Sequence, residues 1–310
     1  MARAVVATAY GGAEVLEVVD VEVPAPGEGE VLVEVRAAGF NPADWKVYGG
    51  LWGADPEALP RRVGMEAAGV VSAVGPGVDL EVGQEVVVHP AQGAFSELLL
   101  ARASAVHPKP AGLDWDTAAG LLLAGSTAWH CLEAVGLGEG RHEGEVLLVH
   151  GGAGSVGSLV VQLAVARGAR VLATGSERST EYIASLGATP LRYGEGLLER
   201  VRRAGAPTAA VDTVGTDEAL EVSMALVPPL RVATIAGFRR GAELGVRLLG
   251  AGGDPGTQVR RASKRPLLEM AAHGELTVRV AGRFGFSRIR EAHELLVSGH
   301  APGKVVVVPD

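Results

Sequence analysis

Cysteine is almost absent from this sequence, which holds a single cysteine, Cys131, among its 310 residues. One cysteine excludes an internal disulfide bond and a cysteine-rich metal site. This usage fits a reducing compartment, so we expect a cytoplasmic protein.

Clustered basic residues and long apolar runs are also missing. The formal net charge is −8, and the basic pairs at 202–203, 239–240 and 260–261 are short and scattered. This balance argues against nucleic acid or an anionic membrane as a partner. No uninterrupted apolar run approaches the roughly 18 residues of a membrane span. No basic region followed by an apolar segment opens the chain, so we expect no secretory signal.

Apolar residues make up 47% of the sequence, and its length is sufficient for two domains. Residues 2–110 form short apolar stretches separated by Gly and Pro, which predicts β-strands joined by turns. From about residue 114, apolar strands alternate with helical stretches, which predicts βαβ units and a parallel sheet. Strand character returns after about residue 276. We therefore expect an α/β protein with a β-rich domain of residues 1–121 and 277–310, and an inserted doubly wound domain of residues 122–276.

A glycine array follows the apolar run at 146–149 and leads into an apolar helix. Gly152, Gly154 and Gly157 form the pattern G-x-G-x-x-G. We expect the first glycine to permit a tight turn, the second to let a diphosphate approach the backbone, and the third to allow close helix–strand packing. The N–H groups and positive end of the helix then bind the phosphates. The alternative is a strand–helix turn without a ligand. The predicted Rossmann loop consists of Gly152, Ala153, Gly154, Ser155, Val156 and Gly157.

The residues after the next strand indicate which dinucleotide binds. An NAD site usually places Asp or Glu about 20 residues beyond the loop, but Gly175 and Ser176 stand there and Arg178 follows. A hydroxyl and a guanidinium suit a 2′-phosphate, which a carboxylate would repel. This predicts NADPH rather than NADH, although Glu177 would serve as the ribose acid if the loop were shifted by one residue. Tyr193 packs against the same phosphate or adenine, or is a packed aromatic at a strand end.

Six segments taken together resemble one known family: GFNPADWKVYGG, GMEAAGVVSAVGPGV, LLLAGSTAWHCL, GGAGSVG, VDTVG and APGKVVVV. They are similar to the quinone oxidoreductase (zeta-crystallin-like) branch of the medium-chain dehydrogenase/reductase superfamily, over essentially the whole chain. The resemblance implies a GroES-like β-rich catalytic domain and a Rossmann domain with the active site in the cleft between them. It also implies NADPH and a homodimer.

The resemblance further implies positions around the cofactor. Thr127 matches the position that contacts the nicotinamide amide, and its alternative role is a helix hydroxyl bonded to the preceding turn. Gly237 and Phe238 match positions beside the nicotinamide edge, and Val214 matches one over the adenosine side. Lys304 follows a family pattern near the cleft rim, or is simply a charged residue at the start of a strand.

Zinc-dependent relatives carry Cys where this chain has Asn41 and His where it has Met65, and their four-cysteine lobe is absent here. Amide and thioether are poor zinc ligands, so we expect no metal. Alcohol oxidation builds a localised alkoxide that zinc stabilises. Hydride addition to an enone or quinone builds a delocalised anion that hydrogen-bond donors stabilise. We therefore predict an NADPH-dependent, zinc-independent reductase of small quinones or α,β-unsaturated carbonyls.

The candidate donors for that anion lie between residues 41 and 52. Asn41 faces the cleft by family position and is also the expected N-cap of a short helix. Asp44 is a second candidate, or only a first-turn carboxylate. Lys46 and Tyr48 protonate or hydrogen-bond the substrate, or are solvated surface groups. Trp52 stands where many relatives carry Tyr, which removes a proton donor and adds an apolar wall.

Two other functions stay open. A reductase of enoyl thioesters carried by CoA or a carrier protein, in a bacterial biosynthetic pathway, needs a basic entrance. The second alternative function is a protein that binds NADPH without turnover. Consumption of NADPH with any acceptor distinguishes an enzyme from such a binding protein. The candidates for the basic entrance, which are otherwise ordinary surface residues, are Arg239, Arg240, Arg260, Arg261 and Lys264.

Overall fold

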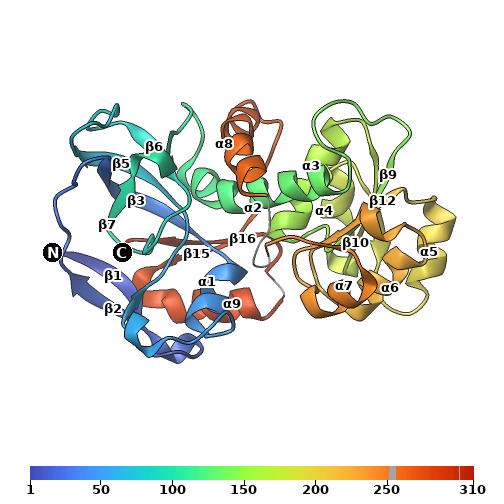
Figure 1. Ribbon diagram of the computed structural model, residues 1–310, viewed down its shortest axis with the longest axis horizontal. Helices are drawn as coiled ribbons and strands as arrows, with labels where there is room; N and C mark the ends of the chain where they lie inside the picture. Colours follow the sequence, from blue (N-terminus) through green and yellow to red (C-terminus); the bar gives the residue numbers. More distant parts are fainter. Residues whose placement is uncertain (251–255, 300) are drawn as a thin grey trace. The chain divides into compact units, whose positions relative to one another are not determined.

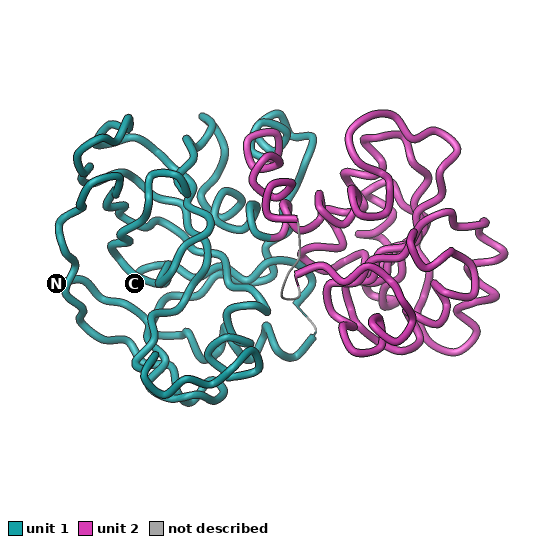
Figure 2. The backbone as a smooth tube through the Cα atoms, in the orientation of Figure 1, with its two compact units in different colours: residues 1–123, 268–310 teal, residues 124–267 magenta. Residues whose placement is uncertain are grey.

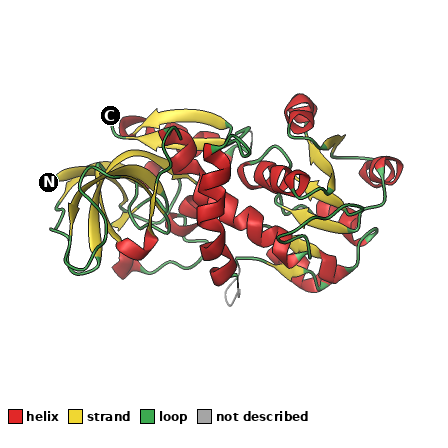
Figure 3. Ribbon diagram, turned by 90° about the horizontal axis from the view of Figure 1, so that it is seen from above, coloured by secondary structure: helices red, strands yellow, loops and turns green. Residues whose placement is uncertain are grey.

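The computed structural model describes residues 1–250, 256–299 and 301–310. The chain divides into two compact units (Figure 2). Unit 1 comprises Met1–Leu123 and Leu268–Asp310, and unit 2 comprises Ala124–Leu267. The predicted α/β class is confirmed, with one strand-rich unit and one in which strands alternate with helices (Figure 3).

Unit 1 contains two sheets, one of three strands in the order β2-β1-β4 and one of seven strands. The larger sheet has the order β15-β16-β3-β5-β6-β8, and β7 also pairs with β3. Its longest strand, β3, has the sequence EVLVEVRAAGF, in which alternate β-branched side chains enter the core. The strands of unit 1 are β1 Ala2–Ala7, β2 Leu16–Val21, β3 Glu30–Phe40, β4 Arg61–Arg62, β5 Ala67–Val74, β6 Glu85–Val88, β7 Leu98–Arg102, β8 Val106–Pro108, β15 Val280–Gly285 and β16 Lys304–Val308.

The register of β16 against β3 determines which residues meet at the end of β3. The two strands are antiparallel, with Val305 opposite Phe40. Continuing that register by one residue brings Lys304 next to Asn41, which follows β3 directly. The start of β16 therefore lies against the start of the helix that follows β3.

Two short helices of unit 1 follow the predictions. Helix α1, Pro42–Tyr48, begins after the N-cap Asn41 with proline in its first turn, as expected from NPADWKVY. Helix α9, Ile289–Val297, lies where the SRIREAHELLVSG stretch, with apolar residues three and four positions apart, predicts a helix. Helices α2, Trp115–Ala134, and α8, Thr257–Ala272, each contribute residues to both units.

Unit 2 is a six-stranded parallel sheet in the order β11-β10-β9-β12-β13-β14, with helices packed around it (Figure 1). The chain starts in the middle of the sheet at β9, builds outward to β11, and then returns to build β12 to β14 on the other side. This is the doubly wound arrangement, in which ligands bind at the carboxyl ends of the strands where the order reverses. Its strands and helices are β9 Val146–His150, α3 Ser155–Ala166, β10 Arg170–Gly175, α4 Thr180–Ser185, β11 Thr189–Arg192, α5 Leu197–Ala204, β12 Ala209–Asp212, α6 Asp217–Met224, β13 Val232–Thr234, α7 Phe238–Leu244 and β14 Arg247–Leu248.

Each unit has its own hydrophobic core. Val33, Phe40 and Phe95 are fully buried in unit 1, and Leu148 and Leu172 are fully buried in unit 2. Burying such a side chain contributes roughly 1.5–3 kcal/mol. No helix among the described residues is both long enough and apolar enough to cross a bilayer.

Candidate functional site

The glycine loop lies between β9 and α3, at the position where the strand order of unit 2 reverses. Gly151 has φ +82°, a conformation that favours glycine. The tight turn predicted for Gly152 is therefore made by the preceding residue. Gly152 is required for packing instead, since a Cβ there would lie 2.7 Å from the Cβ of Ala173.

The other two glycines of the loop differ in what surrounds them. A Cβ on Gly157 would lie 2.1 Å from the carbonyl oxygen of Gly151, so only glycine lets α3 pack this closely. On Gly154, the N-cap of α3, the nearest atom would be that same oxygen at 3.4 Å. The packing of the protein thus does not require glycine at 154, whereas a diphosphate approaching the backbone does. The open space at Gly154 therefore fits the approach of a dinucleotide's diphosphate to the backbone of the loop.

The other predicted cofactor residues of the sheet lie at the carboxyl ends of its strands, which share one edge. Ser176 follows β10 and is partly exposed, and Arg178 beyond it is exposed. Tyr193 follows β11 with 56% of its surface exposed, and its N–H donates to the carbonyl of Gly175 at 3.3 Å. It therefore lies beside the turn that holds Ser176. The sequence prediction of a packed aromatic does not describe this residue.

Turns after the next two strands complete this edge. Val214, exposed, follows β12, and Gly237 and Phe238 follow β13. Thr127 lies apart from the sheet, half-buried on α2. Ala153, Ser155 and Val156 in the glycine loop are partly exposed.

Sequence reasoning missed four buried polar residues beneath these turns. They stand at or next to the ends of β9, β10, β12 and β13, and each is at most 3% exposed. A polar residue that ends an apolar strand, as in VLLVH and AAVD, was the available signal. These residues are His150, Thr174, Asp212 and Thr234.

Asp212 shapes two of the turns. Its Oδ1 accepts the N–H groups of Val214 at 3.0 Å and Gly215 at 2.9 Å, and its Oδ2 accepts the hydroxyl of Thr234 at 2.7 Å. The Thr234 hydroxyl in turn accepts the N–H of Gly237 at 2.9 Å. The positions of Val214 and Gly237 therefore depend on one buried carboxylate.

In unit 1, Asn41 is almost fully buried and its amide is fully engaged. Its Nδ2 donates to the Gly39 carbonyl and to Glu66 Oε1, both at 3.1 Å. Its Oδ1 accepts from Lys304 Nζ at 2.5 Å. Both amide protons and the amide oxygen are thus committed within the protein. Asn41 therefore has no amide proton left to donate to a substrate.

Lys304 and Glu66 form a buried ion pair with an Nζ–Oε1 distance of 2.6 Å and side chains 1% and 0% exposed. Burial alone raises the pKa of Glu66, but Lys304, His89 and the Leu123 N–H lower it, and the net pKa is lowered. A Cβ at Gly39 would lie 2.6 Å from Glu66 Oε1, so the absence of a side chain there makes room for the pair. Lys304 thus lies in the interior of unit 1, with its ammonium bonded to protein groups.

Asp44 is the second carboxyl of this buried group. Its Oδ2 accepts the Asn41 N–H at 2.8 Å, while its Oδ1 has no hydrogen-bond partner among the described residues. Burial raises its pKa from 3.8 to about 7, although the bond from Asn41 and the charge of Lys304 lower it. Asp44 is therefore substantially protonated near neutral pH.

The remaining three candidates differ in exposure. Tyr48 is 1% exposed and its hydroxyl is hydrogen-bonded to His293 Nδ1, so the expectation of a solvated or substrate-facing phenol is wrong. Burial and the charge of Asp44 raise its pKa. Lys46 is half-buried, and burial lowers its pKa below 10.5. Trp52 lies beyond α1 with 55% of its surface exposed.

The two positions compared with zinc ligands hold an amide, Asn41, and a thioether, Met65. Asn41 is bonded as described above, and the backbone carbonyl of Met65 lies 3.2 Å from His89 Nδ1. Over residues 1–250, 256–299 and 301–310, no three His, Cys, Asp or Glu side chains are grouped so as to hold a metal ion.

Three of the five basic residues considered for a thioester entrance are paired with carboxylates or buried. Arg239 and Arg240 pair with Glu243 at 3.1 and 3.0 Å, and Arg240 also pairs with Glu221 at 3.3 Å. Lys264 is 6% exposed. Arg260 is partly exposed and Arg261 is exposed.

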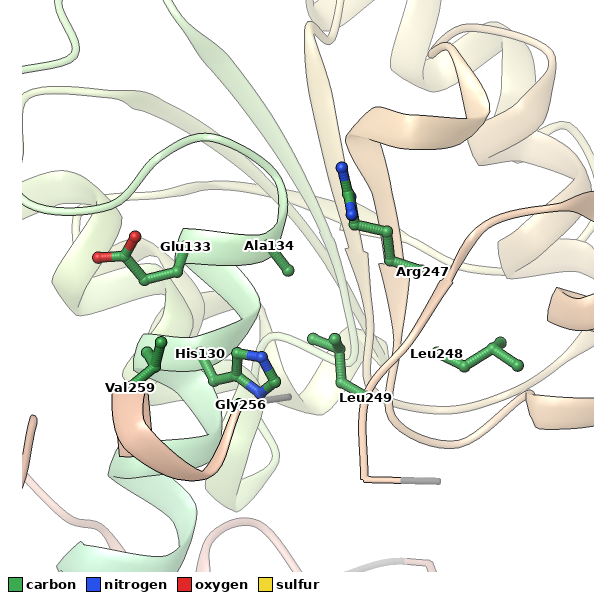
Figure 4. Close-up of a pocket in the computed structure, with 8 residues that line it drawn as sticks. All are labelled: His130, Glu133, Ala134, Arg247, Leu248, Leu249, Gly256 and Val259. Atoms are coloured by element: carbon green, nitrogen blue, oxygen red, sulfur yellow. The ribbon is translucent and has the colours of Figure 1, made fainter. Parts of the chain in front are cut away.

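A separate pocket of about 400 Å³ lies within unit 2, between α2, the end of β14 and the start of α8 (Figure 4). Its described lining includes none of the predicted cofactor residues, so we do not assign it to the dinucleotide. The lining residues are His130, Glu133, Ala134, Arg247, Leu248, Leu249, Gly256 and Val259.

The glycine loop at the switch point of a parallel sheet, in a chain with a separate β-rich unit, defines a dinucleotide-binding protein of the dehydrogenase class. Family models agree. Residues 27–111 match the alcohol dehydrogenase GroES-like domain, and residues 192–307 match the zinc-binding dehydrogenase model.

Individual relatives identify the branch. The chain is 32% identical to the chloroplastic NADPH-dependent alkenal/one oxidoreductase of Arabidopsis thaliana, over 97% of this chain and 78% of that protein. It is 30% identical to the quinone oxidoreductase of Pseudomonas aeruginosa over the full length of both. The crystal structure of Escherichia coli quinone oxidoreductase complexed with NADPH superimposes with a TM-score of 0.85, at 27% identity, over 99% of this chain and 100% of that one. The chain belongs to the medium-chain dehydrogenase/reductase superfamily and to its quinone oxidoreductase branch, which confirms the resemblance seen in the sequence.

Proposed function

We propose that this protein is an NADPH-dependent reductase that transfers hydride to a small quinone or α,β-unsaturated carbonyl compound. The observation that carries the proposal is the glycine loop, where the absent side chain of Gly154 leaves an approach to the backbone that packing does not require. The activities named for the relatives, alkenal/one and quinone reduction, agree with it.

Four groups of residues would hold the dinucleotide. The loop from Gly152 to Gly157 and the N-terminus of α3 would bind the diphosphate. Ser176, Arg178 and Tyr193 would bind the 2′-phosphate, since two of them are exposed and one is partly exposed at adjacent strand ends. The turns with Val214 and with Gly237 and Phe238 would contact the ribose and nicotinamide side, together with Thr127. Glu177 is exposed next to Arg178, so the proposal of NADPH over NADH requires its own test.

When bound, NADPH supplies the hydride. Addition of hydride to the β-carbon of an enone leaves an enolate, whose oxygen carries negative charge until a proton arrives. This chain must then provide a hydrogen-bond donor for that oxygen and a source for the proton. Asn41, Asp44 and Tyr48 are buried on or next to α1 and fix that helix. Lys46 is a half-buried cation on the same helix. We assign it the role of hydrogen-bond donor to the enolate oxygen and of proton source.

Lys46 predicts a specific pH dependence. It donates only while protonated, so kcat/KM should fall as the pH rises through its pKa, which burial places below 10.5. Lys46→Met should lower kcat/KM by roughly 10²-fold or more and remove this alkaline limb. Lys46→Arg keeps a donor that does not titrate, so it should retain part of the activity without the limb. Steady-state rates from pH 6 to 10 check this. A Lys46→Met enzyme with wild-type kcat/KM would leave water as the proton source.

The activity itself is tested by NADPH and NADH oxidation with quinones, cyclic enones, enoyl thioesters and ketones. We expect turnover with the first two classes and a preference for NADPH. No NADPH oxidation with any acceptor would indicate a protein that binds the nucleotide without turnover. Interconversion of alcohols and ketones with no reduction of enones or quinones would contradict the proposal.

The cofactor preference is tested in the same assay by Arg178→Ala. Loss of a charge-assisted contact should reduce the preference for NADPH over NADH by roughly tenfold or more. Arg203→Ala, which removes an exposed arginine of α5, is the matched control and should leave the preference unchanged. If Arg178→Ala also leaves it unchanged, Arg178 does not bind the 2′-phosphate.

We also propose that the protein acts as a cytoplasmic homodimer, and that residues 1–121 with 277–310 and residues 122–276 act as its catalytic and cofactor domains. The lone, buried Cys131 suits a reducing compartment. Size-exclusion chromatography with light scattering tests the dimer. A monomer that retains full activity would contradict it.

A further inference from the structure

One buried residue, Thr174, holds the N–H groups of Gly151 and Gly152, where the chain enters the glycine loop. Its hydroxyl accepts the N–H of Gly151 at 3.2 Å, and its backbone carbonyl accepts the N–H of Gly152 at 2.8 Å. Both N–H groups therefore point into unit 2. The N–H groups at the start of α3, later in the loop, are the ones placed for an anion.

The Thr174 hydroxyl is connected to helix α6 through His150. Ser223 Oγ donates its only proton to the Ala219 carbonyl at 2.8 Å. Its oxygen must then accept from His150 Nε2, which lies 3.1 Å away, so Nε2 carries a proton. In a neutral ring Nδ1 is then an acceptor, and the Thr174 hydroxyl faces it in a long contact of 3.5 Å.

These contacts form one directed chain of donors and acceptors. It runs from the Gly151 N–H to the Thr174 hydroxyl, to His150 and to the hydroxyl of Ser223. Protonated His150 would carry a hydrogen on Nδ1, so the Thr174 hydroxyl could no longer donate to that nitrogen. Burial lowers the pKa of His150 to about 4, with a partly offsetting effect of Asp212, so the ring is neutral at pH 7.

We propose that Thr174 and His150 are positioning residues that hold the glycine loop in the shape that receives the diphosphate of the dinucleotide. The inference rests on the proposed function, because it assigns a role toward the same cofactor. Neither residue contacts the cofactor in this role, since both are at most 3% exposed. They act through the backbone of Gly151 and Gly152, and small displacements of such a loop weaken the phosphate contacts.

The test compares ligands with and without a diphosphate. Thr174→Val removes the hydroxyl at constant shape and leaves the Gly151 N–H without its partner. We expect it to raise the Kd for NADPH and for ADP-ribose roughly tenfold. Adenosine 2′-monophosphate has no diphosphate, and its proposed phosphate contacts, Ser176 and Arg178, lie outside the glycine loop. Its Kd should therefore stay within about twofold of the wild-type value. Thr174→Ser restores the hydroxyl and should restore both affinities.

Thr189→Val, at the exposed amino end of β11, is the matched control and should bind all three ligands as the wild type does. Equal weakening of all three ligands by Thr174→Val would indicate general loosening and overturn the inference. Unchanged NADPH affinity in Thr174→Val would overturn it while leaving the proposed function intact. A wild-type protein that binds no NADPH would overturn both.

The direction of the chain is tested without any ligand. Long-range ¹H–¹⁵N correlation spectra at pH 7 report the tautomer of each histidine, and His150→Asn identifies the signal of His150. We expect one protonated nitrogen, Nε2. A charged ring, or a ring protonated at Nδ1, would overturn the assignment.

Discussion

At the scale of single residues, burial decides what each polar group does. Asn41, Asp44, Lys46 and Tyr48 stand within eight positions of one another in the sequence, and each was a candidate donor. In the structure, three of them are at most 2% exposed and one is half-buried. Only the half-buried one, Lys46, combines access to solvent with a pKa moved toward neutrality. The same residue types in another fold would have different roles.

Asp44 predicts how stability depends on pH. Its pKa is 3.8 when unfolded and about 7 in the folded protein, because burial disfavours the carboxylate. The folded state therefore keeps a proton that the unfolded state loses, and the free energy of unfolding falls as the pH rises from about 4 to about 7. The full effect is on the order of 4 kcal/mol.

Asp44→Asn should remove this loss, because the amide cannot ionise and still accepts the Asn41 N–H. The variant should be more stable than the wild type at pH 8, with a smaller difference at pH 4. Urea unfolding between these pH values measures it. Asp79→Asn, at an exposed position, controls for removal of one negative charge. If the free energy of unfolding of Asp44→Asn fell with pH as steeply as that of the wild type, Asp44 would not be the cause of the pH dependence.

At the scale of secondary-structure elements, three chain segments far apart in the sequence meet at one buried ion pair. Glu66 precedes β5, Lys304 starts β16, and Asn41 links β3 to α1. The local pattern NPADWKVY was sufficient to predict α1, since capping and proline act over a few residues. The pair itself depends on register between strands, which local sequence does not encode.

The ion pair predicts a strong non-additive effect of mutation. Lys304→Met should lower the free energy of unfolding by about 3–5 kcal/mol, because it leaves Glu66 charged and buried. Glu66→Gln should also destabilise, since it leaves the ammonium without its counter-charge. The double variant should lose less than the two single losses combined, because neither charge remains.

A double-mutant cycle of urea unfolding at pH 7 measures this coupling. Strictly additive losses would contradict a direct interaction. Arg36→Ala, which removes an exposed ion pair to Glu34, is the control and should cost less than about 1 kcal/mol.

One helix, α8, was not predicted from the sequence. Helix α8 spans Thr257–Ala272 and contains Pro266 in its interior. Proline removes a backbone donor and usually ends a helix, so the TQVRRASKRPLLEMAA stretch did not show a clear helical pattern. Packing of its apolar residues Leu267 and Leu268, 0% and 3% exposed, supplies the stabilisation that local propensity lacks.

At the scale of the whole molecule, the proposed activity draws on both units. Unit 2 carries the glycine loop and the turns at the carboxyl ends of its sheet, and unit 1 carries Lys46. The alternation of strand and helix after residue 114 predicted the parallel sheet, because this periodicity belongs to each segment separately. The return of a strand pattern after about residue 276 also predicted that the end of the chain belongs to the β-rich unit.

The sequence by itself determined the fold class, the dinucleotide loop and the family, since each depends on residues close together in the chain or on motifs in a fixed order. It did not reveal that the tight turn belongs to Gly151, or that His150 and Thr174 lie beneath the loop. Only the tertiary structure decided which polar side chains are buried and bonded, because desolvation and hydrogen-bond partners come from segments distant in sequence. Asn41 and Lys304 show this most clearly, as each was predicted at the site and each is held in the interior by the other.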